Sequence, residues 1–78
     1  MNTLTDQAKI PNTTNIWNAD NSFHASIKIY SRYDVDLKVY VVWTMDPTGV
    51  QQENTFRVFA HAAGRYNDAV AFYTTTSH

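Results

Sequence analysis

Apolar and polar residues alternate along most of the stretch from residue 23 to residue 45. The apolar positions are Phe23, Ala25, Ile27 and Ile29 in the first half and Val35, Leu37, Val39, Val41, Trp43 and Met45 in the second. A period of two over this length is typical of β-strands that bury one face. The pattern predicts two antiparallel strands joined by a three-residue loop, Ser31 to Tyr33.

The loop fixes a register for this hairpin. With residues 31–33 in the loop, Ile29 lies opposite Val35, and inward-facing residues meet inward-facing residues along both strands. Lys28 then lies opposite Asp36, and a cross-strand pair of opposite charge contributes about 0.2–1 kcal/mol. The predicted buried face therefore carries the odd-numbered residues of both strands.

A second tight turn follows at Asp46 to Gly49, where Asp, Pro and Gly stand in the order that a type I turn prefers. It predicts a third strand from about Gln52 to Ala62, with Met45 paired to Val50. A helix from about Val50 to Ala63 is the alternative, because its apolar residues also fall on one helical face. In that case Gly64 terminates the helix.

The two ends of the chain show weaker patterns. Residues 68–76 are compatible with a strand or with a short helix capped by Asn67. Residues 1–22 are rich in Asn, Thr and Asp and show no periodicity, so we expect a polar N-terminal arm. The apolar pair Ile16 and Trp17 predicts a docking point of this arm on the core or on a second subunit.

These patterns predict a mostly β fold, namely a small antiparallel meander of three to four strands with a C-terminal strand or short helix. The alternative is an α+β fold of order ββαβ, with the helix near residues 50–63. The predicted organisation is an arm, residues 1–22, followed by one small domain, residues 23–78. A single sheet layer cannot bury its own apolar face, so a helix or a second subunit must cover it.

Composition narrows the picture further. The chain has 78 residues, no cysteine and a formal net charge of −1. A domain of this size has a small stability margin, and without disulfides we expect self-association to stabilise it. The absence of cysteine also favours a reducing, cytoplasmic location. The longest apolar run, Val39 to Trp43, is too short to cross a bilayer, so no membrane partner is expected.

The outward face of the predicted sheet supplies the candidate site. It combines aromatic and cationic side chains, which are enriched in the centres of protein interfaces. The residues expected to contact a partner are Tyr30, Lys38, Tyr40, Arg57 and Phe59, with Trp17 as the anchor of the arm. Aromatic rings interleaved with cations also bind single-stranded nucleic acid, by base stacking and phosphate contacts. Asp34, Asp36 and Glu53 are expected on the same face and oppose that second use.

No motif predicts catalysis, a cofactor or a metal site. His24, His61 and His78 lack the close spacing of metal-binding pairs, and no glycine-rich phosphate loop is present. Asp34 and Asp36 are two residues apart, and we interpret them as surface charge rather than a catalytic pair. We therefore expect no enzyme and no cofactor.

The sequence favours a small non-catalytic binding protein that acts through a protein–protein surface. We expect it to be a homodimer and to serve as a regulator or inhibitor of a larger protein. Single-stranded nucleic-acid binding on the aromatic and basic sheet face is the alternative.

Overall fold

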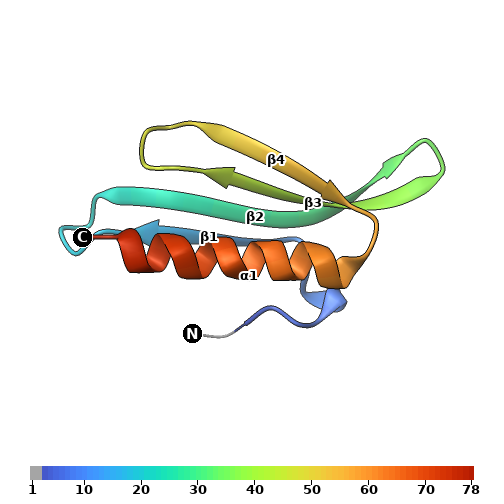
Figure 1. The fold of residues 1–78 in the computed structure, drawn as a ribbon, viewed down its shortest axis with the longest axis horizontal. Coiled ribbons are helices and arrows are strands. Elements are labelled where there is room, and N and C mark those ends of the chain that lie inside the picture. The colour runs from blue at the N-terminus through green and yellow to red at the C-terminus, as the bar shows by residue number, and fades with distance from the viewer. Residues whose placement is uncertain (1–2) are drawn as a thin grey trace.

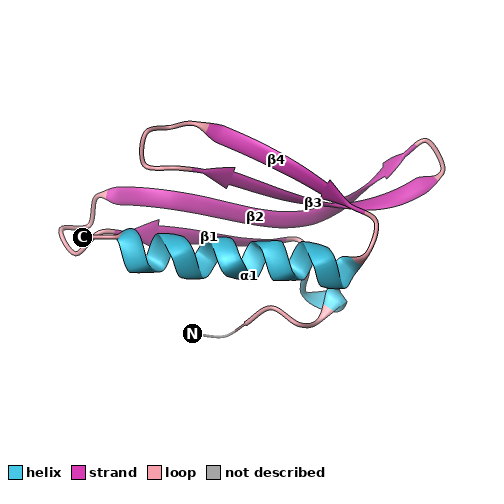
Figure 2. Ribbon diagram, in the orientation of Figure 1, coloured by secondary structure: helices cyan, strands magenta, loops and turns pink. Residues whose placement is uncertain are grey.

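The computed structural model of this chain describes residues 3–78, and Figure 1 shows a four-stranded sheet with one long helix against it. The strands are β1 (Asn12–Trp17), β2 (Phe23–Asp34), β3 (Leu37–Met45) and β4 (Gln51–Phe56), and the helix is α1 (Phe59–Thr76). Every neighbouring pair is antiparallel and the spatial order is β1-β2-β3-β4. The predicted mostly β fold, an antiparallel meander of three to four strands with a C-terminal strand or short helix, is therefore confirmed, and its C-terminal element is a helix of 18 residues (Figure 2).

The predicted register of the β2–β3 hairpin is wrong. The turn contains only Val35 and Asp36, and Ile29 pairs with Val42 while Lys28 pairs with Trp43. The shift turns the even-numbered residues of β3 toward the face that holds Ile29. Alternation did not decide the register because the even-numbered face of β3, although it also carries Lys38 and Thr44, holds Tyr40 and Val42, and these two can pack on the apolar face of β2.

The same turn places a β-branched residue in an unfavourable backbone conformation. Val35 has a φ of 58°, whereas two-residue hairpin turns normally place Gly, Asn or Asp where φ is positive. The left-handed region costs an L-residue roughly 1–2 kcal/mol. Because valine is not a usual turn residue, the sequence shows no clear turn signal at residues 35–36, and the loop was predicted at residues 31–33 instead.

The next hairpin follows the prediction more closely. Asp46 accepts hydrogen bonds on its side chain from the N–H groups of Thr48 (2.9 Å) and Val50 (3.0 Å), and Gly49 adopts a φ of 86°. The third predicted strand exists, but it ends at Phe56 rather than at Ala62 and pairs Met45 with Gln51. The alternative helix near residues 50–63 is wrong, because residues 51–56 form β4 and α1 begins only at Phe59.

Helix α1 runs through Gly64, the residue that would have ended the alternative helix. Gly64 lies on its exposed side, and a Cβ atom built there meets no other atom within 4 Å. The buried side chains recur at helical spacing and form the inner face: Ala62, Ala63, Tyr66, Ala69 and Val70. This spacing lets α1 lie along the sheet, so burial outweighs the helix penalty of about 1 kcal/mol that an internal glycine imposes.

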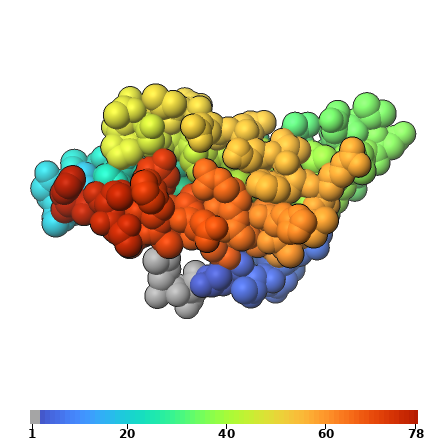
Figure 3. Space-filling model, viewed as in Figure 1, coloured from blue at the N-terminus to red at the C-terminus, as the bar shows by residue number. Residues whose placement is uncertain are grey.

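One face of the sheet and the inner face of α1 form the core. The buried sheet residues in contact with the helix cluster are Ile16, Ala25, Ile27, Ile29, Tyr40 and Val42. Phe56 and Phe59 extend this core where β4 leads into the helix. Figure 3 shows this side of the molecule, with α1 in orange and red across the front.

The segment predicted to be a polar arm is integrated into the domain. Its first two residues lie outside the described part of the chain. A short 3-10 helix, η1 (Gln7–Lys9), precedes β1, which pairs with β2 along its whole length. Ile16 is buried in the core, as the docking prediction allowed, while Trp17 is 56% exposed.

The β2–β3 hairpin is longer than the helix that covers it. Twelve residues of β2 extend about 40 Å at 3.3 Å per residue, whereas eighteen residues of α1 extend about 27 Å at 1.5 Å per residue. The end of the hairpin therefore projects past the first turn of α1 (Figure 1). The molecule reaches 44 Å along its longest axis.

Candidate functional site

The face of the sheet opposite α1 is the candidate interaction surface, and we name it the open face. Among residues 3–78, no helix or strand packs on it. Strand alternation and pairing place these side chains on it: Trp17, Phe23, Ser26, Lys28, Tyr30, Arg32, Asp34, Leu37, Val39, Val41, Trp43, Met45, Gln51, Glu53 and Thr55. It therefore mixes a largely apolar centre with two cations and two acids.

An apolar row along β3 forms the centre of the open face. The row is Leu37, Val39, Val41, Trp43 and Met45. Val39 and Val41 are 4% and 0% exposed, because the long side chains of paired and neighbouring strands flank them. Leu37 is 42% exposed at the projecting end, and Trp43 and Met45 are half-buried. A strand that is apolar on both faces is typical of a sheet covered on both sides.

Lys28 and Trp43 lie opposite each other in this face and interact directly. The ammonium of Lys28 is 4.8 Å from the centre of the Trp43 ring, a cation–π contact, and the indole N–H donates to Gln51 at 3.3 Å. Lys28 and Trp43, together with Tyr30 and Glu53, border a hollow of about 580 Å³ that Pro11 and Thr13 complete. The hollow offers an aromatic wall, one cation and one carboxylate.

An aromatic pair occupies the end of the open face that lies away from the β2–β3 turn. Trp17 and Phe23 pair across the strands, with ring centres 5.7 Å apart in an edge-to-face arrangement. A β-bulge beside them puts His24 on the helix side, where its ring nitrogen bonds to the hydroxyl of Thr76 at 2.9 Å. The bulge explains why simple alternation misplaced both Phe23 and His24.

The six predicted contact residues do not share one face. Tyr30 lies on the open face, as expected, and Trp17, which was expected to anchor the arm, lies there too. Tyr40 is buried on the helix side, where it accepts from the side-chain amide of Gln7 (2.5 Å) and stacks edge-to-face on Phe59 (5.7 Å). Placing Tyr40 and Phe59 on the outward sheet face is therefore wrong: the register of β3 turns Tyr40 inward, and Phe59 belongs to α1, since β4 already ends at Phe56.

The two predicted cations also lie away from the open face. Lys38 is exposed beside Tyr40, 5.5 Å from its ring centre, and Arg57 is exposed in the link between β4 and α1. Sequence reasoning missed the whole apolar row of β3, Leu37 to Met45, and also Phe23 and Arg32 on β2. Trp43 was assigned to the buried face, and only the correct register reveals it.

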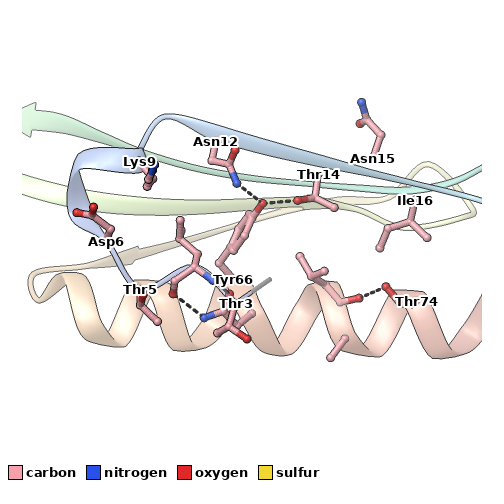
Figure 4. Close-up of a pocket in the computed structure, with 14 residues that line it drawn as sticks. Thr3, Thr5, Asp6, Lys9, Asn12, Thr14, Asn15, Ile16, Tyr66 and Thr74 are labelled. Carbon is pink, nitrogen blue, oxygen red and sulfur yellow. Dashed lines mark hydrogen bonds between the residues drawn. The ribbon is translucent and has the colours of Figure 1, made fainter. Parts of the chain in front are cut away.

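A cavity of about 830 Å³ with a mixed polar and apolar lining lies on the other side, between β1, α1 and the N-terminal segment (Figure 4). Tyr66 projects into its wall from α1, and its hydroxyl accepts from the side chain of Asn12 (2.9 Å) and bonds to Thr14. The side-chain amide of Asn67 bonds both ways to the backbone of Leu4, at 2.9 Å each. These bonds hold the N-terminal segment against the helix.

Two aspartates have lowered pKa values, and both lie in turns. The hydroxyl of Thr48 bonds to Asp46 (2.6 Å) and, with nearby backbone N–H groups, lowers the pKa of this carboxyl. Ser22 lowers the pKa of Asp20 in the same way, through its hydroxyl (2.5 Å) and its N–H (2.9 Å). Both carboxylates stabilise turns rather than line a cleft.

The candidate metal and catalytic groups are dispersed. His24 and His61 do not lie on one sheet face, because His61 is exposed on α1. Asp36 lies in the hairpin turn, so Asp34 and Asp36 are not two carboxylates on one strand face. Within residues 3–78, no three histidine, aspartate or glutamate side chains come together as metal ligands. Over the same residues, α1 is too polar to serve as a membrane-crossing helix.

Comparison with known proteins adds no relative: no family model, curated protein or solved structure matches this chain.

Proposed function

We propose that this chain is a non-catalytic protein-binding domain that acts through its open face and forms a homodimer there. The observation that carries the proposal is the apolar row of β3 from Leu37 to Met45, which faces away from α1 and has no second layer among residues 3–78. Val39 and Val41 are already buried in the single copy, so covering the row removes apolar surface from water mainly at Leu37, Trp43 and Met45, at about 25 cal/mol per Å².

A second copy of the same chain suits the charge of this face. Lys28 and Arg32 supply two positive charges, and Asp34 and Glu53 supply two negative charges, so the face is close to neutral. Two such faces meet without net repulsion, whereas a strongly charged partner gains little long-range attraction. Sheets that pack face to face lie about 10 Å apart, a spacing that Trp43 and Tyr30 can fill.

The test is the molar mass in solution across a concentration series, measured by light scattering or sedimentation. We expect a reversible dimer, and we expect Trp43→Ser to raise its dissociation constant about thirtyfold or more, because a half-buried aromatic at the centre of an interface commonly contributes 2 kcal/mol or more.

Phe72→Ser is the matched control. Phe72 is 59% exposed on α1, so this substitution removes a comparable exposed aromatic from the other side of the molecule. The dimer of this variant should match that of the unaltered protein. A chain that stays monomeric at every concentration contradicts the proposal, and so does equal weakening by both substitutions.

Within this proposal, the role we favour is that of a regulator or inhibitor of a larger protein, because one small domain with an interaction face is enough for it. A cytoplasmic location, inferred from the absence of cysteine, stays a prediction.

Single-stranded nucleic-acid binding is the second candidate, favoured by the cation–π pair of Lys28 and Trp43 beside Tyr30. A base stacked on such rings contributes about 1–3 kcal/mol. A labelled oligothymidine, titrated at two salt concentrations, tests this use. Binding should weaken steeply with salt and with Lys28→Ala, but not with Lys9→Ala, which removes an exposed lysine from η1. Oligothymidine binding that changes neither with salt nor with Lys28→Ala contradicts nucleic-acid binding at this site.

A further inference from the structure

The projecting end of the β2–β3 hairpin is an exposed apolar tip. Val35 is 89% exposed at the turn, with Tyr33 at 69% and Leu37 at 42% on either side. Asp34 and Asp36 flank Val35 directly. Figure 3 shows the tip, in green, standing clear of the body formed by α1 and the sheet. The tip therefore presents one aliphatic side chain between two carboxylates.

The backbone at the tip indicates that Val35 has a use other than stability. Positive φ is rare for a β-branched residue, and glycine or asparagine fits this position without the same clash. Residues held in such conformations cluster at functional sites. An exposed valine makes few contacts within its own chain that offset the strain, so an offsetting contact has to come from another molecule.

The open face offers a receptor for this tip. The hollow beside Lys28, Tyr30 and Trp43 has aromatic walls, and its volume of about 580 Å³ exceeds that of a valine side chain. Lys28 brings positive charge to it, complementary to the aspartates of the tip. Glu53 also borders the hollow, on the β4 side.

The positions of tip and hollow agree with a two-fold axis. Val35 is seven residues from Lys28 along β2, about 23 Å at 3.3 Å per residue. The pair Arg32 and Val39 lies about halfway between them. If two open faces pack with their hairpins antiparallel and an axis near this pair, each tip reaches the hollow of the other copy. A two-fold interface requires this reciprocity.

We infer that Val35 of each copy inserts into the hollow beside Lys28 and Trp43 of the second copy, with Asp34 facing Lys28 across the dimer. The inference rests on the proposed function and adds the element that fixes the orientation of the two copies. It makes the strained hairpin tip an interface element, and it makes the hollow incomplete without the partner.

Val35→Gly tests the inference because a purely structural role of the tip and a role in the interface predict different results. In the folded monomer, glycine relieves the positive φ, so the melting temperature of dilute protein should rise. If the tip is an interface element, the dissociation constant should rise about tenfold or more in the same variant. A tip with only a structural role changes the first quantity and leaves the second unaltered.

A charge exchange tests the orientation independently of the turn. Asp34→Lys and Lys28→Asp should each weaken the dimer, and the doubly exchanged protein should recover most of the loss, because the pair is restored with reversed charge. Asp68→Lys is the control, since Asp68 is exposed on α1 and undergoes the same charge change.

The outcomes separate the inference from the proposed function. A chain that is monomeric at every concentration overturns both the proposed function and the inference. A dimer that Trp43→Ser weakens, but that Val35→Gly and Asp34→Lys leave unchanged, retains the open-face dimer and overturns the inserted tip. Weakening by both single charge changes without recovery in the double variant overturns the pairing of Asp34 with Lys28.

Discussion

Val42 and Val41 are neighbours on β3 and are both almost completely buried, yet they are buried in different ways. Val42, 2% exposed, faces α1 and belongs to the core that the helix closes. Val41, 0% exposed, faces the other side, where its paired neighbours are Tyr30 and Thr55 and no second layer follows. The covered face is thus completed by a tertiary contact, whereas the open face is shielded only by side chains of the sheet itself.

Apolar content alone therefore does not identify the core face of a strand. The more apolar face of β3 is the open one, and the neighbouring strands decide which face is covered. Ala25, Ile27 and Ile29 on β2 provide a continuous apolar surface for the helix. The open side of β2 instead carries Lys28, Tyr30 and Arg32. The helix packs where two adjacent strands are apolar together.

The largest effect should come from the covered face. Ile27→Ala removes a fully buried side chain beneath α1, so the free energy of unfolding should fall by about 2–5 kcal/mol. Denaturant melts of dilute protein measure it. Trp43→Ser, on the open face, should cost the monomer less, because Trp43 is only half-buried. Equal losses would contradict the contrast between the two faces.

The polar edge of the covered face should give a smaller effect. Tyr66→Phe removes the hydroxyl that bonds to Asn12 and Thr14, and leaving those groups without this partner should lower stability by about 1–2 kcal/mol. Tyr73→Phe is a suitable comparison, since Tyr73 packs on the same core. A melting temperature unaffected by Tyr66→Phe would mean that these bonds hold β1 against α1 only weakly.

The helix that closes the covered face should tolerate a more rigid residue at its only glycine. Gly64→Ala should raise the free energy of unfolding by about 0.5–1 kcal/mol, because Gly64 is exposed within α1 and a Cβ atom there meets nothing within 4 Å. Thermal melts followed by circular dichroism measure the gain. A loss of stability would indicate that the helix is interrupted near residue 64, as the sequence pattern suggested.

The smallest effect concerns the exposed turn between β3 and β4. The pKa of Asp46 is lowered, so the folded protein binds fewer protons there than the unfolded chain does. This stabilises the fold above the usual pKa of 3.8, and the stabilisation disappears as the pH falls through the lowered value. Relative to Asp46→Asn, the unaltered protein should have the higher melting temperature at neutral pH. The two should converge in acid, and a constant difference across the titration would contradict this account.

Much of the architecture is determined by local sequence signals. The alternation of residues 23–45 indicates a hairpin, and the Asp46–Gly49 turn specifies the next one through hydrogen bonds that Asp46 makes within a few residues. The size, the charge and the absence of cysteine follow from the printed sequence alone. A mostly β meander with a C-terminal element follows from these signals, because strand period and turn chemistry act over short distances.

Tertiary packing was needed to set the register of β3, the continuity of α1 and the composition of the open face. A two-residue turn with Val35 at positive φ carries no usual turn signal, and a strand with apolar residues on both faces fits either register. Gly64 resembles the end of a helix in the sequence. The helix continues past it because Tyr66 and Val70 are buried against the sheet. As a result Tyr40 and Phe59 belong to the core rather than to the outward face, and Trp43 belongs to the open face rather than to the core. The physical reason is that long-range burial, summed over many contacts, outweighs local preferences of about 1 kcal/mol at individual residues.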